Sequence, residues 1–220
     1  MLAMVEDDYY PVECSDQAFF LNAGIVFDAN EVQEHIEEHA VPHSAALLAR
    51  VRETQSPYFT GALARVNASW QNLGQNAKVA AAKAGLRPPE ANPFMNNVAQ
   101  AVEIVDALDR CADLCRKLAE PGAIASSSLP VPFEVKAGRA VGFTEAPRGA
   151  LFHDLTLDAE GRVTHASILT PTAQNVANLE VDMRLLAEKL VADGAAEDVV
   201  RLEIEKLVRA YDPCLSCSVH

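Results

Sequence analysis

Two cysteines and a histidine lie in the last seven residues of the sequence, as Cys214, Cys217 and His220. Pro213 precedes them directly, and Asp212 precedes the proline. Thiolate sulfur and imidazole nitrogen are ligands that suit transition metals. A spacing of three residues allows both sulfur atoms to meet one ion, each at about 2.3 Å. The tail therefore indicates a transition-metal site.

A Cys-x-x-Cys pair also occurs in redox dithiols and as one half of a zinc site. A zinc site needs two more ligands, and neither His35 nor His39 comes with a second Cys-x-x-Cys. A thioredoxin-like pair would follow a strand and begin a helix, whereas this pair follows a helical pattern. Both interpretations stay open as alternatives to a larger metal centre.

Three segments upstream of the tail share its unusual composition. They are Glu37–Ser44, then Glu145–Gly149 with the sequence Glu-Ala-Pro-Arg-Gly, and Pro171–Asn175 with the sequence Pro-Thr-Ala-Gln-Asn. With the tail motif Asp-Pro-Cys-x-x-Cys-x-x-His, their order and approximate spacing resemble the large subunit of nickel–iron hydrogenases. The resemblance covers nearly the entire chain. It implies a helical fold with a small sheet near the metal site, and reversible oxidation of dihydrogen.

The resemblance also implies how the centre is held. Cys214 and Cys217 would bind nickel, with one of them bridging to an iron that carries carbon monoxide and cyanide. Pro147, Pro171 and Thr172 would line the pocket of these diatomic ligands. Thr172 has a simpler alternative role as the cap of the helix that follows it. His220, at the end of the chain, would bind a magnesium or iron ion.

Three residues would take part in the chemistry. Cleaving dihydrogen heterolytically needs a Lewis-acidic metal and a nearby base for the proton. By resemblance Arg148 would lie over the open face of the metal pair, and either its guanidine or the Cys214 thiolate would be that base. Asp212 would hold Arg148 through a charge-assisted contact. The alternative for Arg148 is a surface turn residue, and we expect structural roles for His39 and His43.

Half of the usual cysteine set is missing from this sequence. The family carries a second pair, Arg-x-Cys-Gly-x-Cys, which does not occur here. Cys14 is isolated, and Cys111 and Cys115 lie four apart in a helical pattern, so we expect them to be buried, inert thiols. Three explanations remain: a large subunit split over two polypeptides, a fragment or processing product of a longer chain, or a degenerate half with a structural role.

The expected partners follow from this gap. A chain or segment carrying Arg-x-Cys-Gly-x-Cys would complete the centre, and iron–sulfur clusters would lie only on a partner small subunit, since this chain has no cysteines for them. Gln174, where many membrane-bound relatives carry tryptophan, favours the cytoplasmic type that is linked to nicotinamide through diaphorase subunits. The rival from another class is a non-catalytic assembly subunit.

Composition agrees with a cytoplasmic protein. Eighteen Lys and Arg against 31 Asp and Glu give a net charge of −13, with no basic cluster for nucleic acid. No apolar run reaches the roughly 18–20 residues of a membrane span.

The helices and strands that carry these residues are predicted from the spacing of apolar residues and from capping residues. We expect a mainly helical, α-rich α+β chain that forms a single region: helical over 30–120, a small antiparallel sheet over 131–170, and helices plus a metal-binding tail over 172–220. The expected helices are 30–48, 56–70, 75–84, 92–118, one from 172 that ends at Gly194, and a final one that includes Val200, Ile204, Leu207, Val208 and Tyr211. The expected strands are 133–143, 149–157 and 163–169.

Overall fold

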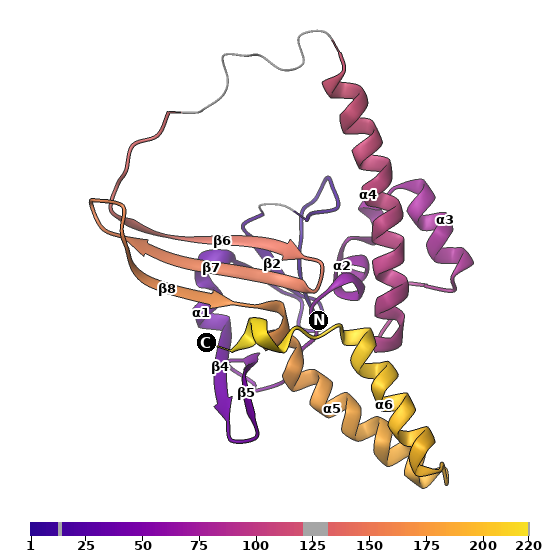
Figure 1. Cartoon of the computed structure of the whole chain (residues 1–220). Helices are drawn as coiled ribbons and strands as arrows, with labels where there is room; N and C mark the ends of the chain where they lie inside the picture. The colour runs from indigo at the N-terminus through magenta and orange to yellow at the C-terminus, as the bar shows by residue number, and fades with distance from the viewer. Residues whose placement is uncertain (13–14, 121–131, 220) are drawn as a thin grey trace.

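The computed structural model describes residues 1–12, 15–120 and 132–219 (Figure 1). Its strands and α-helices are, in chain order, β1 (Leu2–Met4), β2 (Gln17–Phe20), β3 (Ile25–Asp28), α1 (Val32–His35), β4 (Ile36–Val41), β5 (Ser44–Val51), α2 (Ala62–Ser69), α3 (Gln75–Lys83), α4 (Asn96–Leu118), β6 (Gly138–Ala146), β7 (Gly149–Leu157), β8 (Val163–Leu169), α5 (Pro171–Ala192) and α6 (Glu197–Tyr211). Short 3-10 helices are η1 (Ala29–Glu31), η2 (Trp70–Asn72), η3 (Pro93–Met95) and η5 (Leu215–Ser218). The predicted α-rich α+β class is confirmed.

The described strands form three small antiparallel sheets, β1-β2-β3, β4-β5 and β6-β7-β8. Strands β6 and β7 pair from Gly138 with Leu157 to Ala146 with Gly149, which leaves a two-residue turn at Pro147 and Arg148. The first and third sheets share one apolar cluster that includes Phe20, Phe27, Phe143 and Phe152. Arg148 is therefore carried at the tip of a hairpin whose base is packed.

The helices form the other main part of the molecule, with α2, α3 and α4 on one side and the α5–α6 hairpin extending away from the sheets (Figure 1). A second apolar cluster joins both groups, through Leu63 of α2, Val102 of α4, Leu179 of α5 and Leu207 of α6. The chain leaves α6 at Tyr211 and returns past the start of α5 as the tail (Figure 1).

The helix predicted over 30–48 is wrong. Only α1 and η1 are helical there, and Ile36–Val51 forms the β4–β5 hairpin with Pro42 and His43 at its turn. Leu48 of β5 packs on Val176 and Ala177 of α5, so burial against a distant helix determines the conformation of this segment. A four-residue apolar spacing is a weak guide when such packing competes with it. The helical character assigned to 30–120 holds from residue 62 onward.

Three smaller expectations are also corrected. Helix α2 begins at Ala62 and not at Ser56, because the preceding residues run extended beside β1, where the Leu2 amide donates to the Phe59 carbonyl at 2.8 Å. Thr170, two residues before Thr172, is the cap of α5. Cys111 and Cys115 are exposed. Strands β7 and β8, by contrast, have the predicted bounds, whereas Cys14 lies outside the described residues.

Candidate metal centre

The hairpin tip that carries Arg148 is held close to the backbone before α2. Gly149 has φ +133°, and a Cβ there would lie 2.5 Å from Thr60 Cγ2. Gly61 also has a positive φ, +135°, and a Cβ there would lie 3.2 Å from the Arg148 carbonyl oxygen. Both positions therefore need glycine, because any side chain would push the hairpin tip away from the segment before α2. The family-like Pro-Arg-Gly sequence is explained locally by this close approach.

Asn175 and Thr60 connect this tip to α5. The Asn175 amide donates to the Thr60 carbonyl at 2.9 Å and to the Arg148 carbonyl at 3.3 Å, and its oxygen accepts from the Thr60 amide at 2.9 Å. The Thr60 hydroxyl accepts from the Ala150 amide at 2.9 Å. These buried bonds fix the Arg148 backbone relative to the first turn of α5, where Thr172 lies.

A buried arginine, Arg65 of α2, supports the same hairpin from inside. Its side chain donates twice to Glu103, at 2.7 Å each, and once to Glu145 at 2.8 Å. It also donates to the carbonyls of Ala146 at 2.9 Å and Pro147 at 3.2 Å. Arg65 is 3% exposed, so these five hydrogen bonds replace those that water would make to its guanidinium.

The charged groups of this cluster shift one another's pKa values. Burial alone would lower the pKa of Arg65, but Glu145 and Glu103 raise it well above its usual range. Burial raises the pKa of Glu145, while Arg65 and the Met4 amide, which donates to it at 2.8 Å, oppose that rise. The guanidinium thus stays charged and anchors the two carbonyls that lead into Arg148.

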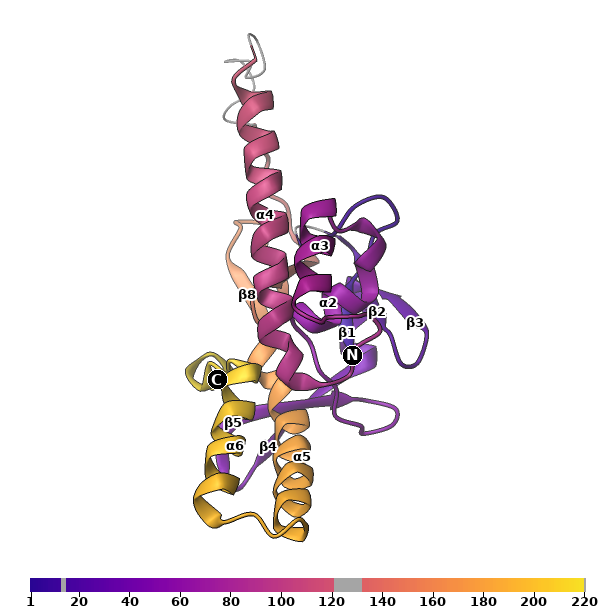
Figure 2. The same ribbon diagram turned by 90° about the vertical axis from the view of Figure 1, so that its right-hand side faces the viewer.

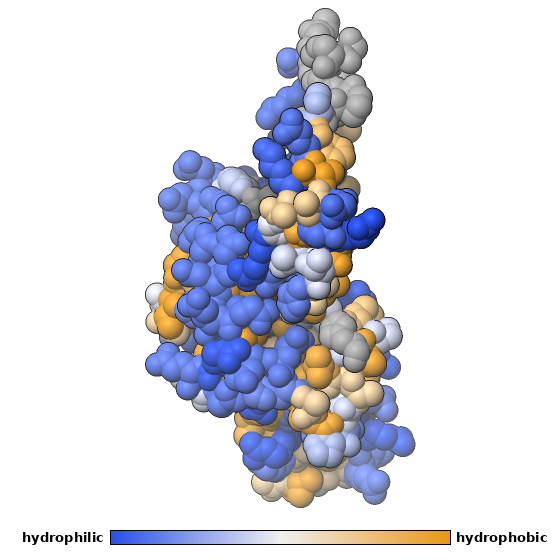
Figure 3. Space-filling model, turned by 90° about the vertical axis from the view of Figure 1, so that its left-hand side faces the viewer, coloured by the Kyte–Doolittle hydropathy of each residue, from blue (hydrophilic) through white to orange (hydrophobic). Residues whose placement is uncertain are grey.

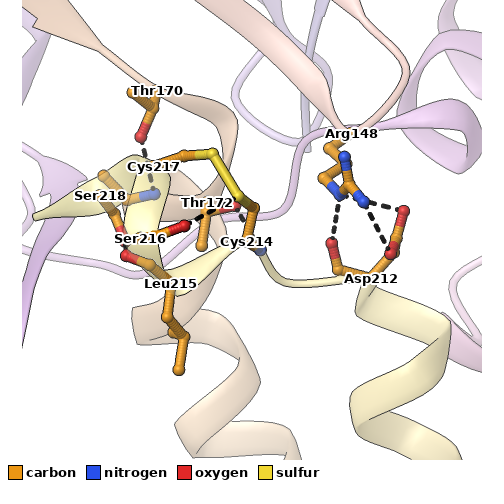
Figure 4. The surroundings of a disulfide bond; sticks show 10 residues. Arg148, Thr170, Thr172, Asp212, Cys214, Leu215, Ser216, Cys217 and Ser218 are labelled. Carbon is orange, nitrogen blue, oxygen red and sulfur yellow. Dashed lines mark hydrogen bonds and ion pairs between the residues drawn. A yellow bond between two sulfur atoms is a disulfide. The ribbon is translucent and has the colours of Figure 1, made fainter.

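Arg148 itself reaches the tail, as the sequence predicts. Its Nε donates to the Asp212 carbonyl at 2.7 Å, and its Nη2 donates to Asp212 Oδ1 at 3.1 Å (Figure 4). Asp212 ends α6 in the left-handed region, with φ 50°, which turns the chain sharply toward the hairpin. The contact between Arg148 and Asp212 is confirmed; their part in catalysis stays a prediction.

The two tail cysteines lie just beyond Asp212 (Figure 4). The Cys214 amide donates to the Thr172 hydroxyl at 3.1 Å. Cys214 and Cys217 are joined as a disulfide in this structure, which places both sulfur atoms at one point beside the Arg148–Asp212 pair. Thr172 is buried, whereas Cys217 is exposed. The tail thus presents its sulfurs toward solvent.

The remaining predicted site residues are placed less closely. Pro171 is buried at the first turn of α5, and Pro147 is exposed at the hairpin tip. His220 lies outside the described residues. His43 Nε2 lies 2.8 Å from Glu180 Oε1 on the surface, in agreement with a structural role. Thus Arg148, Asp212, Cys214, Cys217 and Thr172 come together.

The supporting residues Arg65, Glu103, Thr60 and Gly61 were not singled out from the sequence. For Arg65 the sequence offers one signal, an arginine inside a helix that is mostly small and apolar, Ala62–Ser69.

Two sulfurs fit half of a thiolate-held metal pair. Within the described part of the chain, no group of three or more His, Cys, Asp or Glu side chains could hold a metal ion. When reduced, Cys214 and Cys217 can supply two soft ligands, with a fixed positive charge beside them at Arg148. The described residues therefore offer two sulfur ligands with a cation near them.

Comparisons with known proteins agree with this geometry. Residues 52–220 match the profile of nickel-dependent hydrogenases, and the chain belongs to this family. It is 39% identical over 204 residues to the alpha subunit of sulfhydrogenase 1 from Pyrococcus furiosus, covering 90% of this chain and 44% of that protein. The NAD-reducing hydrogenase HoxS subunit beta of Cupriavidus necator is 35% identical over 127 residues, covering 56% of this chain and 25% of that protein.

Solved structures show the same fold. An NAD⁺-reducing NiFe-hydrogenase in its H2-reduced state matches with a TM-score of 0.78 at 22% identity, over 100% of this chain and 50% of that one. A NiFeSe-hydrogenase from Dm. baculatum matches with a TM-score of 0.54 at 22% identity, over 93% and 47%. The chain thus spans about half the length of the proteins it matches. In the described residues, no helix is both long and apolar enough to cross a membrane.

Proposed function

We propose that this chain supplies one half of the nickel–iron centre of a hydrogenase that oxidises dihydrogen reversibly. The observation that carries the proposal is the convergence of Cys214 and Cys217 on the Arg148–Asp212 pair and Thr172, from three separate segments of the chain (Figure 4). The same residues carry the motifs of the family to which the chain belongs. Geometry and sequence therefore support the same site.

In this proposal Cys214 and Cys217 would be ligands of a nickel–iron centre whose iron would carry carbon monoxide and cyanide. Such a centre supplies a Lewis acid and an electron acceptor for dihydrogen. Pro147, Pro171 and Thr172 line the pocket of the diatomic ligands. His220 binds a magnesium or iron ion near the end of the tail.

Arg148 and Asp212 take part in the transfer of the proton from dihydrogen. The guanidinium is held at both Nε and Nη2 by Asp212, so its position near the tail is fixed before substrate arrives. The Cys214 thiolate would accept the proton released from dihydrogen while Arg148 stays a cation near it. In the alternative, Arg148 would accept that proton as a neutral guanidine, after it has lost a proton of its own.

The missing donors come from a partner in the same proposal. A chain or segment with Arg-x-Cys-Gly-x-Cys contributes two more thiolates, and an iron–sulfur small subunit takes the electrons. The similarity to an NAD-reducing hydrogenase subunit supports nicotinamide-linked partner subunits and a cytoplasmic complex.

The test is metal analysis of the complex that contains this chain. We expect nickel and iron in the wild-type complex and dihydrogen–deuterium exchange activity. Cys214→Ser and Cys217→Ser should each abolish both, since a serine hydroxyl is a poor ligand for nickel. Cys111→Ser and Cys115→Ser, which change exposed thiols away from the site, are the matched controls and should keep both. A nickel-free wild-type complex, or retained nickel in the Cys214→Ser variant, contradicts the proposal.

A second candidate is a non-catalytic dithiol or zinc protein, favoured by the disulfide between Cys214 and Cys217 and by the lack of further ligands among the described residues. It predicts that the isolated chain binds one zinc ion per molecule when reduced. The absence of zinc binding by the isolated chain would reject it.

A further inference from the structure

Helix α4 has a packed half and a projecting half. Its first turns lie against α2 and α3, where Ala99 and Val102 are buried, and its last turns extend beyond the rest of the molecule (Figure 2). The projecting half is too far from the core to be stabilised by it. Isolated helical segments of this kind are marginal in water without a packing partner.

The projecting half carries a continuous apolar stripe. Its members follow one another at alternating spacings of four and three residues, which places them on one face of the helix. We call this surface the α4 stripe: Ile104, Leu108, Cys111, Cys115 and Leu118. Ile104 is 61% exposed, Leu108 65% and Leu118 56%, and both cysteines are exposed. Over these residues the helix extends for about 21 Å.

Seen from the side of the β6–β8 sheet, the projecting end of the molecule shows apolar surface among polar residues (Figure 3). Ile104, the first residue of the stripe, is on the side of α4 toward the β6–β7 hairpin, since it lines a cavity with Ala146 and Pro147. The exposed apolar area runs along the projecting half of α4, so it is larger than the single exposed apolar side chains of an ordinary surface. It has the width and period of a helix–helix contact.

A cavity lies between the first residue of the α4 stripe and the β6–β7 hairpin that carries Arg148. Its volume is about 420 Å³, and its lining includes Ile104 from the stripe, Val12, Arg65 and the hairpin tip at Ala146 and Pro147. A segment that packs on the stripe therefore reaches the back of the hairpin that presents Arg148. The same cavity exposes one side of the Arg65 cluster.

The length of the matched relatives bears on what could cover the α4 stripe. The matched relatives are about twice as long as this chain, so a complementary half of similar size is available to cover it.

We propose that the α4 stripe and the adjoining cavity bind an apolar helix of the polypeptide that brings the second cysteine pair. This inference rests on the proposed function for the identity of the partner. The helix covers Leu108 and both stripe cysteines, and its end fills the cavity behind Pro147.

The stripe contains its own reporters, because Cys111 and Cys115 are exposed thiols. Alkylation with N-ethylmaleimide, read by mass spectrometry, compares the isolated chain with the complex purified from its source. We expect at least tenfold slower labelling of both cysteines in the complex, and labelling restored when the complex is dissociated. Equal labelling rates in the two forms, or purification of the native chain without any partner, overturns the inference.

A matched pair of variants tests the surface directly. Leu108→Glu places a charge in the stripe and should weaken recovery of the complex at least tenfold. Lys117→Glu adds negative charge on the opposite face, at an exposed position, and should leave recovery unchanged; an equal effect of both variants overturns the inference. Circular dichroism of each isolated variant shows that α4 is still folded. Slow labelling in a nickel-free complex supports this interface while contradicting the proposed function, and fast labelling in a nickel-containing complex does the reverse.

Discussion

The two sides of the candidate metal centre are held in different ways. The Arg148 hairpin is fixed by buried groups: Arg65 binds the carbonyls before it, and Asn175 binds its own carbonyl. The tail that carries the cysteines is mostly exposed after Asp212. Besides Arg148, the bond from the Cys214 amide to the Thr172 hydroxyl holds the start of this segment, and Ser218 further along it is buried.

This difference shows which side depends on a partner. The hairpin is preorganised by this chain alone, because each polar group around it is paired inside the fold. The sulfurs are placed at the edge, where donors from another segment can join them. A site divided in this way is rigid where charge must be positioned and open where ligands must be added.

The largest effect is expected from removing the arginine under the hairpin. Arg65→Met leaves Glu145 buried and without its cation, and should cost about 3–5 kcal/mol of unfolding free energy. Burial already raises the pKa of Glu145 while Arg65 opposes the rise. In the variant this pKa rises further, so the cost should shrink as pH falls and Glu145 becomes protonated. Urea unfolding at several pH values measures both effects.

Arg184→Met is the control for that experiment. Arg184 pairs with Glu188, and both side chains are exposed, 63% and 59%. Its loss should cost no more than about 1 kcal/mol. Equal losses in the two variants would mean that the hairpin is not held more firmly than the surface around it.

The next effect concerns Arg148 itself. Arg148→Lys keeps the charge but loses the paired contacts with Asp212, and should lower hydrogenase activity of the complex about 100-fold. Nickel content and stability should be retained, since the ion pair is 42% exposed on each side. Arg139→Lys, which changes another Arg–Asp pair on β6, should keep full activity. Lost nickel in Arg148→Lys would instead assign the residue to assembly of the site.

Part of the structure on both sides of the site was predictable from the sequence. Strands β7 and β8 were predicted at their observed bounds. Helix α5 was expected from residue 172 and begins at Pro171, with Thr170 and not Thr172 as its cap. The Arg148–Asp212 contact was implied by the resemblance to the family. Local turn and cap chemistry leaves a readable pattern because the residues concerned are neighbours in the chain.

The supports of the hairpin were not predictable. Arg65 pairs with residues 38 and 80 positions away, Glu103 and Glu145, and Thr60 pairs with Asn175 across 115. No local spacing encodes such contacts. The β4–β5 hairpin was missed for the same reason, since its apolar residues are ordered by packing on α5.

A smaller effect should distinguish the tail from the hairpin. Thr172→Val removes the hydroxyl that accepts from the Cys214 amide, and should cost about 1 kcal/mol. The amide of Cys214 should then exchange with solvent about five- to tenfold faster, while the Ala150 amide, bound to Thr60, keeps its rate. Thr172→Ser should restore protection at Cys214. Faster exchange at both amides would show that hairpin and tail form one cooperative unit.

The smallest effect concerns the residue that anchors the tail at the end of α6. Tyr211 is buried, donates to Asp182 and accepts from Asn178 at 2.6 Å. Burial, followed by the bond to Asp182, raises its pKa above the usual value near 10. The unfolded phenol therefore loses its proton first, and the stability that Tyr211 contributes is present below pH 10 and falls above it. Tyr211→Phe should cost about 1 kcal/mol at pH 7.

The difference between wild type and Tyr211→Phe should then shrink by about 1.4 kcal/mol per pH unit above pH 10. Urea unfolding at pH 7, 9 and 10.5 measures it, because Tyr10 and Tyr58, whose pKa values are also raised by burial, affect both proteins equally. A constant difference across this range would mean that Tyr211 titrates as it does in the unfolded chain. The tail would then be loosely held even at its anchor, and the contrast with the Arg148 hairpin would be greater than the contacts indicate.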